Sequence, residues 1–176
     1  MIPGATKSDY LATRRPTHRL HARTTVPAPL GDVFEFFSRP ENLGILTPSN
    51  MGFAITSISG PMAEGTLISY RLRVGGVPLK WTTRIDAWEP GRRFVDAQIA
   101  GPYACWWHEH RFEADGADRT IMEDRVLYAP PLGIFGRAAN QLLIKRSLRA
   151  IFSFRSDAIQ LRFGAASVAS AAQVAS

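Results

Sequence analysis

Two neighbouring segments near the middle of the chain constrain the fold most, because apolar and charged residues alternate along both. In the first, residues 103–113, the alternate positions Trp106, His108, His110 and Phe112 fall on one face of an extended strand. The positions between them are mostly charged, which suits a face toward water. A period of two therefore predicts a β-strand with one covered side and one solvent-facing side.

The second segment, Thr120–Tyr128, repeats this alternation after a polar turn at residues 115–118. If that turn closes a hairpin, then His108 or His110 lies across from Asp124, because residues on one face pair at even offsets. A core that had only to fold would seldom hold two imidazoles and a carboxylate. The pair of strands therefore predicts an aromatic interior with a polar end.

Further segments of the chain alternate in the same way and are separated by Gly and Pro turns. They are residues 17–26, 53–59, 66–74, 77–88 and 93–99. In the last of them, Val95 and Ala97 compete with Phe94, Asp96 and Gln98 for the inward face, so the pattern leaves its orientation open. About seven strands with clean alternation and hairpin turns predict one antiparallel sheet with one covered face.

Helical spacing occurs on either side of these strands. Residues 29–38 and a second segment beginning at Pro40 predict two short helices after the first strand, the second ending before Pro48. A long helix is predicted over residues 132–163. Its predicted inner stripe, rich in small residues, is Ala139, Leu143, Ser147, Ala150, Phe154, Ala158 and Leu161. Such a stripe either lets the helix pack closely on the sheet or leaves room between them.

The 176 residues, 45% of them hydrophobic, suffice for one core. We expect a flexible basic arm over residues 1–16, one domain over 17–163 and a disordered Ala/Ser tail over 164–176. The sequence contains no apolar run of membrane-spanning length and no secretory signal pattern. Cys105, the single cysteine, cannot form an internal disulfide, so the chain is expected to be cytoplasmic.

The net charge of +6 is concentrated near the two ends of the chain, because residues 26–136 hold ten Lys/Arg and thirteen Asp/Glu. A fold-built basic groove for nucleic acid is therefore not expected. Basic residues on the long helix are interpreted as a solvated face, with contact to anionic lipid headgroups as the alternative. These residues are Arg137, Lys145, Arg149, Arg155 and Arg162.

Several stretches resemble the SRPBCC superfamily, which includes START domains, pollen-allergen-like proteins, coenzyme Q-binding proteins and polyketide cyclases/dehydrases, and its bacterial ligand-binding branch in particular. They include Phe-Phe-Ser-Arg-Pro-Glu-Asn-Leu (36–43), Trp-His-Glu-His-Arg-Phe (107–112) and Ile-Phe-Ser-Phe-Arg (151–155). The resemblance implies an α+β helix-grip fold, in which an antiparallel sheet of about seven strands wraps around the long C-terminal helix. It also implies a hydrophobic cavity between sheet and helix, and it does not imply a known reaction.

The leading functional hypothesis is binding or carriage of a small hydrophobic, lipid-like or aromatic ligand in that cavity. The candidate ligand-binding residues are Tyr70, Trp81, Gln98, Trp106, His108, His110, Asp124, Tyr128 and Phe154. Ordinary core packing and an internally satisfied His–Asp pair are the structural alternative for these residues.

Two other hypotheses stay open. One is a cyclase or dehydratase enzyme that uses His108 or His110 with Asp124 as an acid–base pair, although the prediction favours a non-enzymatic protein. The other is an interaction module that presents Leu142, Leu148 and Phe152 to a protein or membrane. His-x-His followed by an aspartate lacks a further ligand cluster in the sequence, so neither a metal ion nor a cofactor is expected.

Overall fold

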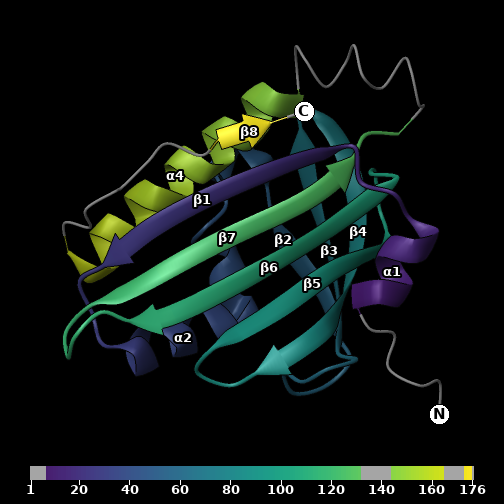
Figure 1. Cartoon of the computed structure of the whole chain (residues 1–176). Coiled ribbons are helices and arrows are strands. Elements are labelled where there is room, and N and C mark those ends of the chain that lie inside the picture. The colour runs from purple at the N-terminus through teal and green to yellow at the C-terminus, as the bar shows by residue number, and fades with distance from the viewer. Residues whose placement is uncertain (1–6, 132–143, 165–172, 176) are drawn as a thin grey trace.

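A single curved antiparallel sheet wraps around helix α4 in the computed structural model, which describes residues 7–131, 144–164 and 173–175 (Figure 1). The strand order is β2-β3-β4-β5-β6-β7-β1-β8. The strands are β1 His18–Val26, β2 Ala54–Ile58, β3 Leu67–Val74, β4 Val77–Glu89, β5 Arg93–Ala100, β6 Cys105–Ala114, β7 Thr120–Ala129 and β8 Gln173–Ala175. The helices are α1 Lys7–Thr13, α2 Leu30–Ser38, the 3-10 helices η1 Pro40–Gly44 and η2 Ser49–Met51, and α4 Lys145–Phe163. The predicted helix-grip α+β fold is confirmed.

Local sequence explains how the sheet turns and bends. Gly75 and Gly76 join β3 to β4 with φ of +57° and +84°, values that glycine adopts without a steric penalty. The register between β4 and β5 shifts twice, and such irregularities increase strand twist. The resulting curvature lets the sheet enclose α4 on its concave side.

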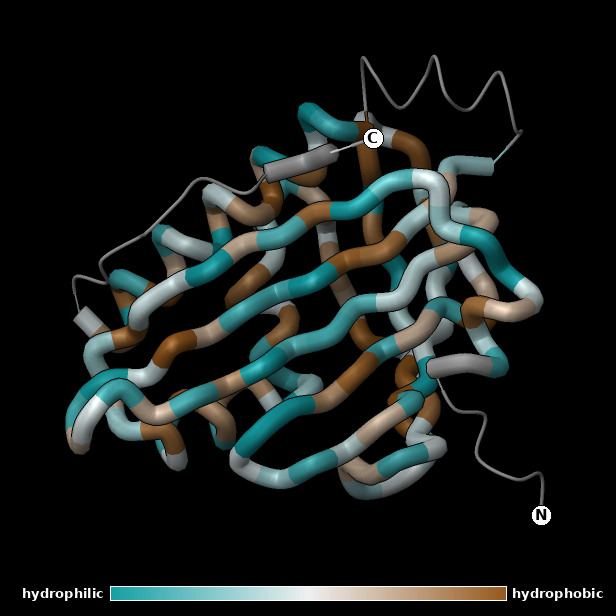
Figure 2. The backbone as a smooth tube through the Cα atoms, in the orientation of Figure 1, coloured by the Kyte–Doolittle hydropathy of each residue, from teal (hydrophilic) through white to brown (hydrophobic). Residues whose placement is uncertain are grey.

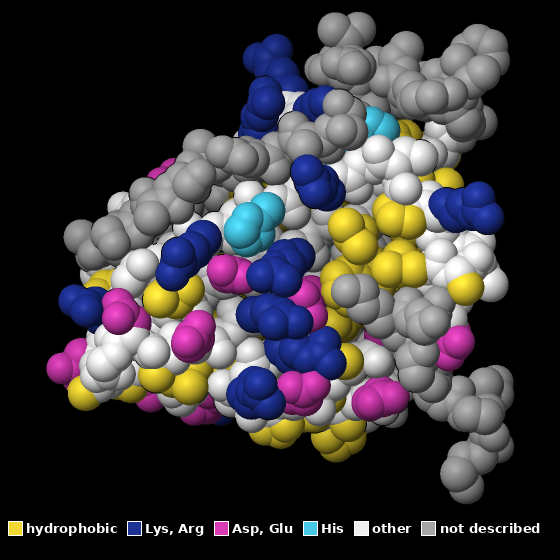
Figure 3. Space-filling view, viewed as in Figure 1, with side chains coloured by type: hydrophobic (Ala, Val, Ile, Leu, Met, Phe, Trp, Pro, Cys, Tyr) yellow, Lys and Arg dark blue, Asp and Glu magenta, His cyan; other side chains and the backbone are white. Residues whose placement is uncertain are grey.

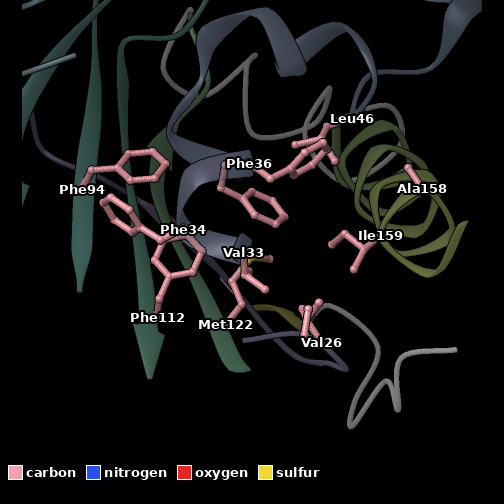
Figure 4. Close-up of a cluster of buried hydrophobic side chains, with 12 residues drawn as sticks. Val26, Val33, Phe34, Phe36, Leu46, Phe94, Phe112, Met122, Ala158 and Ile159 are labelled. Atoms are coloured by element: carbon pink, nitrogen blue, oxygen red, sulfur yellow. The ribbon is translucent and has the colours of Figure 1, made fainter. Parts of the chain in front are cut away.

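Along the strands, hydrophobic and polar residues alternate (Figure 2). The concave face of the sheet carries two separate clusters of buried residues. The first, here called the filled end, comprises Val26, Ala28, Val33, Phe34, Phe36, Phe37, Leu46, Phe94, Phe112, Met122, Ala158 and Ile159 (Figure 4). The second, here called the hollow end, comprises Leu20, Trp81, Trp106, Val126, Tyr128, Leu148 and Phe152. Helix α2 inserts its aromatic residues only into the first.

The predicted inner stripe of the long helix is only partly right, because Ala158 is buried but the other buried positions of α4 lie beside the stripe. Leu148, Phe152 and Ile159 are the large buried residues of α4, whereas Ala150 is exposed and Leu161 is 90% exposed. Large apolar side chains gain more from burial than Ala or Ser, so they decide which face turns inward. Ala139, Leu143 and the predicted first half of the helix lie outside the described residues.

Part of the segment expected to be a flexible arm is helical. Helix α1 packs on the convex side of β5 and β6, where Tyr10 is buried together with Val95, Ala97 and Cys105. Burial raises the pKa of the Cys105 thiol to about 11. The polar composition of the segment gave no sign of this packing, which rests on Tyr10 and the partly buried Leu11.

The expected disordered tail contains a short strand, β8, which pairs with β1 through Arg19↔Ala175 and Leu20↔Val174. Backbone groups make this pairing, so it can form without the alternation of side chains from which the sequence predicted the other strands.

Charged side chains cover much of the convex face (Figure 3). Glu109, predicted to face water, is instead only 2% exposed because Arg93 and Arg111 cover it, with closest nitrogen–oxygen distances of 3.0 and 3.1 Å. Burial would raise the pKa of Glu109, but Arg111 and Arg93 hold it below its ordinary value. In the described part of the chain, no helix is both long and apolar enough to cross a membrane.

Candidate functional site

A pocket of about 330 Å³ lies at the hollow end, between the sheet and α4. Apolar and aromatic side chains form most of its wall, with a small group of charged residues at one end. The sheet contributes Tyr70, Leu72, Val74, Leu79, Trp81 and Trp106; α4 and the residue before it contribute Ile144, Leu148, Ile151 and Phe152; and the segments after α2 contribute Leu43, Thr47, Met51 and Phe53. This composition suits a small, largely apolar molecule.

The aromatic side chains of the wall support one another. Tyr70 stacks on Trp81 with ring centroids 5.9 Å apart, and Trp81 meets Trp106 edge-on at 5.3 Å. Tyr103 contacts both tryptophans, at 5.5 and 4.8 Å. Rings that are fixed by neighbouring rings can line a space without collapsing into it.

The polar end is built across three adjacent strands. Asp96 on β5 pairs in register with His108 on β6, and His110 on β6 pairs with Asp124 on β7. His108 Nε2 and His110 Nδ1 lie 2.9 and 2.8 Å from the same atom, Asp124 Oδ1. Asp96 Oδ2 lies 3.2 Å from His110 Nε2 and 3.6 Å from His108 Nδ1. Two imidazoles are thus held between two carboxylates.

The protonation of these groups follows from burial and from their neighbours. Burial would raise the pKa of Asp124, but Arg155 and the two histidines hold it well below its ordinary value. Burial would raise the pKa of Asp96, but the hydrogen bond to His110 together with the charges of His108, His110 and Arg155 holds it below its ordinary value. Burial and the neighbouring His110 lower the pKa of His108, while carboxylate contacts raise that of His110 despite its burial. The two histidines therefore differ in proton affinity.

Arg155 completes the polar end from α4. Its guanidinium lies 5.1 Å from the Phe37 ring centre and 3.7 Å from Asp124 Oδ1, and its side chain is 12% exposed. The prediction that Arg155 belongs to a solvated face is therefore wrong; Arg149 is exposed, and Arg137 lies outside the described residues. Aromatic packing and a buried carboxylate together stabilise an inward guanidinium.

The structure separates the predicted ligand-binding residues into two groups. Those that line the pocket are Tyr70, Trp81, Trp106, His108 and His110. Asp124 lies behind the histidines, Tyr128 is fully buried and stacks on His18, and Phe154 is 36% exposed outside the pocket wall. Gln98 faces the loop after β5, where its Nε2 donates to the Tyr103 carbonyl at 2.7 Å.

Sequence reasoning missed two residues of the polar end, Asp96 and Arg155. Asp96 shares the inward face of β5 with Phe94, and Val95 and Ala97 face α1, which decides the orientation that alternation left open. Leu148 and Phe152 are buried, so within the described residues they form no exposed patch for a partner; Leu142 lies outside the described residues.

Comparison with solved structures supports the fold. The Zhui aromatase/cyclase of a Streptomyces species is 17% identical, with a TM-score of 0.62 over 81% of this chain and 93% of that one. A START superfamily protein of Mycobacterium smegmatis is 12% identical, with a TM-score of 0.63 over 83% and 97%. Norcoclaurine synthase of Thalictrum flavum, in complex with dopamine and hydroxybenzaldehyde, is 16% identical, with a TM-score of 0.61 over 87% and 89%. No protein-family model and no curated protein matches the sequence.

Proposed function

We propose that the protein binds a small apolar or aromatic molecule that carries one hydrogen-bond-accepting or negatively charged group. The observation that carries this proposal is an apolar pocket of about 330 Å³ that ends in a buried cluster of charged residues. The apolar wall would take the body of the ligand, and the polar end would orient it.

Two buried donors indicate what kind of polar group the ligand has. The indole nitrogen of Trp81 and the Nε of Arg155 make no hydrogen bond within the described part of the chain, and both residues line the pocket. A buried donor without a partner costs roughly 1–3 kcal/mol. Both atoms have almost no exposed surface, so a carbonyl, phenolate or carboxylate oxygen on the ligand would reach them only after neighbouring side chains move, and would then remove part of this cost. The pocket therefore favours an acceptor.

A ligand of this kind is consistent with the structural neighbours. One of them is an aromatase/cyclase, and another was solved with dopamine and hydroxybenzaldehyde bound. At this level of identity the likeness concerns the fold, and the choice of an aromatic ligand rests on the pocket wall itself.

An acid–base enzyme of the cyclase or dehydratase type is the second candidate. It is favoured by His108, which lines the pocket, is uncharged near neutrality because of its lowered pKa, and is oriented by Asp124. An imidazole in this state can accept a proton from a bound molecule. In this case His108→Ala would abolish turnover while ligand binding and the circular dichroism spectrum persist.

The binding proposal is tested with a panel of aromatic carboxylates, quinones and fatty acids, using thermal shift and then calorimetry. We expect at least one acidic member to bind and the Arg155→Gln variant to bind it about 10-fold more weakly, which corresponds to about 1.4 kcal/mol. Arg149→Gln is the matched control, because Arg149 lies on the same helix and is exposed. Absence of any stabilising compound, together with no small molecule in native mass spectra of the purified protein, would refute the proposal.

A further inference from the structure

Three atoms that can ligate a metal ion converge on the pocket side of β5 and β6. They belong to Asp96, His108 and His110, and all three lie within 4.8 Å of one another. Asp96 Oδ2 is 3.2 Å from His110 Nε2 and 3.6 Å from His108 Nδ1. In a tetrahedral zinc site with bonds of about 2.0–2.1 Å, ligand atoms are roughly 3.3 Å apart. The two distances from Asp96 are therefore already close to those of such a site.

The opposite ring nitrogens of both histidines meet one carboxylate. His108 Nε2 and His110 Nδ1 lie 2.9 and 2.8 Å from Asp124 Oδ1, on the side away from Asp96. Histidines that ligate metals almost always donate their second N–H to a carboxylate, a carbonyl or water, which fixes the ring and increases its basicity. Asp124 stands in this relation to both rings at once.

Charge and rigidity also suit a divalent cation. Metal ligation requires both imidazoles to be neutral, and the carboxylates of Asp96 and Asp124 with the guanidinium of Arg155 then give the cluster a net charge of −1. The ligands stand on neighbouring strands in register, with His108 opposite Asp96, so the backbone fixes their spacing. The Asp96 side chain is 19% exposed, which leaves an approach from the pocket.

We infer that Asp96, His108 and His110 form a binding site for one divalent transition-metal ion of the Zn²⁺ type, with Asp124 as the residue that positions both histidines. Three protein ligands leave a fourth position open toward the pocket, as in catalytic zinc sites. That position would take a water molecule or the acceptor group of the proposed ligand. The sequence predicted no metal because the His-x-His pair lacked a further ligand cluster, and alternation left open whether Asp96 faces inward.

This inference goes beyond the proposed function and can be tested without an organic ligand. Tag-free full-length protein is stripped with a chelator and titrated with Zn²⁺ by calorimetry, and with Co²⁺ by visible absorption. We expect one equivalent of Zn²⁺ to bind with a dissociation constant of about 1 μM or below, and Co²⁺ to give the intense bands of a tetrahedral site. Asp96→Asn, which is nearly isosteric, should weaken Zn²⁺ binding at least about 100-fold, and Asp124→Asn about 10- to 100-fold.

His21→Ala is the matched control, because His21 is a half-exposed histidine 3.9 Å from Glu123 and could bind zinc weakly by itself. Wild-type affinity in this variant supports the site. Unchanged Zn²⁺ binding in Asp96→Asn, or absence of any saturable binding in the wild type, overturns it. If Asp96→Asn does not fold, as judged by circular dichroism, His110→Gln takes its place with the same expectation.

Discussion

The filled end and the hollow end are formed by the same sheet and the same helix, yet they differ in how closely they are packed: a pocket of about 330 Å³ lies at the hollow end, whereas the pocket beside Phe37, Leu46 and Phe94 of the filled end measures about 60 Å³. At the filled end, α2 inserts Phe34, whose ring lies edge-on to Phe112 at 5.4 Å, and Ile159 of α4 is buried against the same cluster. At the hollow end, Trp81 and Trp106 pack mainly on each other and on Tyr103, and a pocket remains. Under the proposed function, the filled end supplies stability and the hollow end binds the ligand.

The polar end lies at the boundary between the two. His110 stacks on Phe94 of the filled end with ring centroids 4.3 Å apart, while His108 lies 6.1 Å from Phe152 of the hollow end. The packed cluster can therefore fix one side of the polar group while the other side faces the pocket.

The largest expected effect is a loss of stability at the filled end. Phe112 is 5% exposed and contacts Phe34, Phe37 and Phe94, so Phe112→Ala leaves a cavity that these rings cannot close. We expect the free energy of unfolding to fall by about 3–5 kcal/mol. Urea denaturation followed by circular dichroism measures this change. Phe112→Leu keeps most of the side-chain volume, so its free energy of unfolding should fall clearly less. A fall below about 1 kcal/mol in Phe112→Ala would show that the filled end does not supply most of the stability.

A smaller effect is expected where the hollow end is supported from outside. The Tyr10 hydroxyl of α1 lies 2.9 Å from the carbonyl oxygens of both Gln98 and Trp106 and accepts the Trp106 backbone N–H at 3.2 Å. Tyr10→Phe removes only this hydroxyl, so stability should fall by about 1–2 kcal/mol. The same denaturation experiment measures it.

Thr13→Ala is the control for this variant, because among the described residues the Thr13 hydroxyl bonds only to carbonyls of its own helix. We expect it to change stability by less than about 0.5 kcal/mol. If the two variants behave alike, α1 does not support the wall of the pocket.

The sequence predicted the fold well because the fold depends on local patterns. Alternation of apolar and charged residues located seven strands, and Pro29 and Pro40 marked the two short helices. Strand β8 could not be predicted in this way, because it pairs with β1 through backbone hydrogen bonds and shows no such pattern. Helix α1 could not be predicted either, because a single buried Tyr10 within a polar segment is too weak a signal.

The candidate site was only partly predictable for a related reason. His108, His110 and Asp124 lie on two strands joined by one hairpin, so their spacing along the chain is enough to bring them together. Asp96 depends on the orientation of β5, which the packing of Val95 and Ala97 under α1 decides. The inward position of Arg155 depends on which face of α4 turns toward the sheet. The small residues along that helix led to the prediction of a different inner face.

A small stability change is expected from filling the pocket. Leu72 lines the hollow end and is half-buried, so Leu72→Trp places an indole where space exists and should change the free energy of unfolding by less than about 1 kcal/mol. Ligand affinity should nevertheless fall at least about 10-fold, because the indole occupies the binding volume. Calorimetry with a compound from the panel measures this loss.

Leu67→Trp is the control: Leu67 lies on the same strand, is 37% exposed and does not line the pocket, so its substitution should leave affinity unchanged. A Leu72→Trp variant that binds as the wild type does would place the ligand elsewhere, and one that unfolds would show that the hollow end is packed as tightly as the filled end.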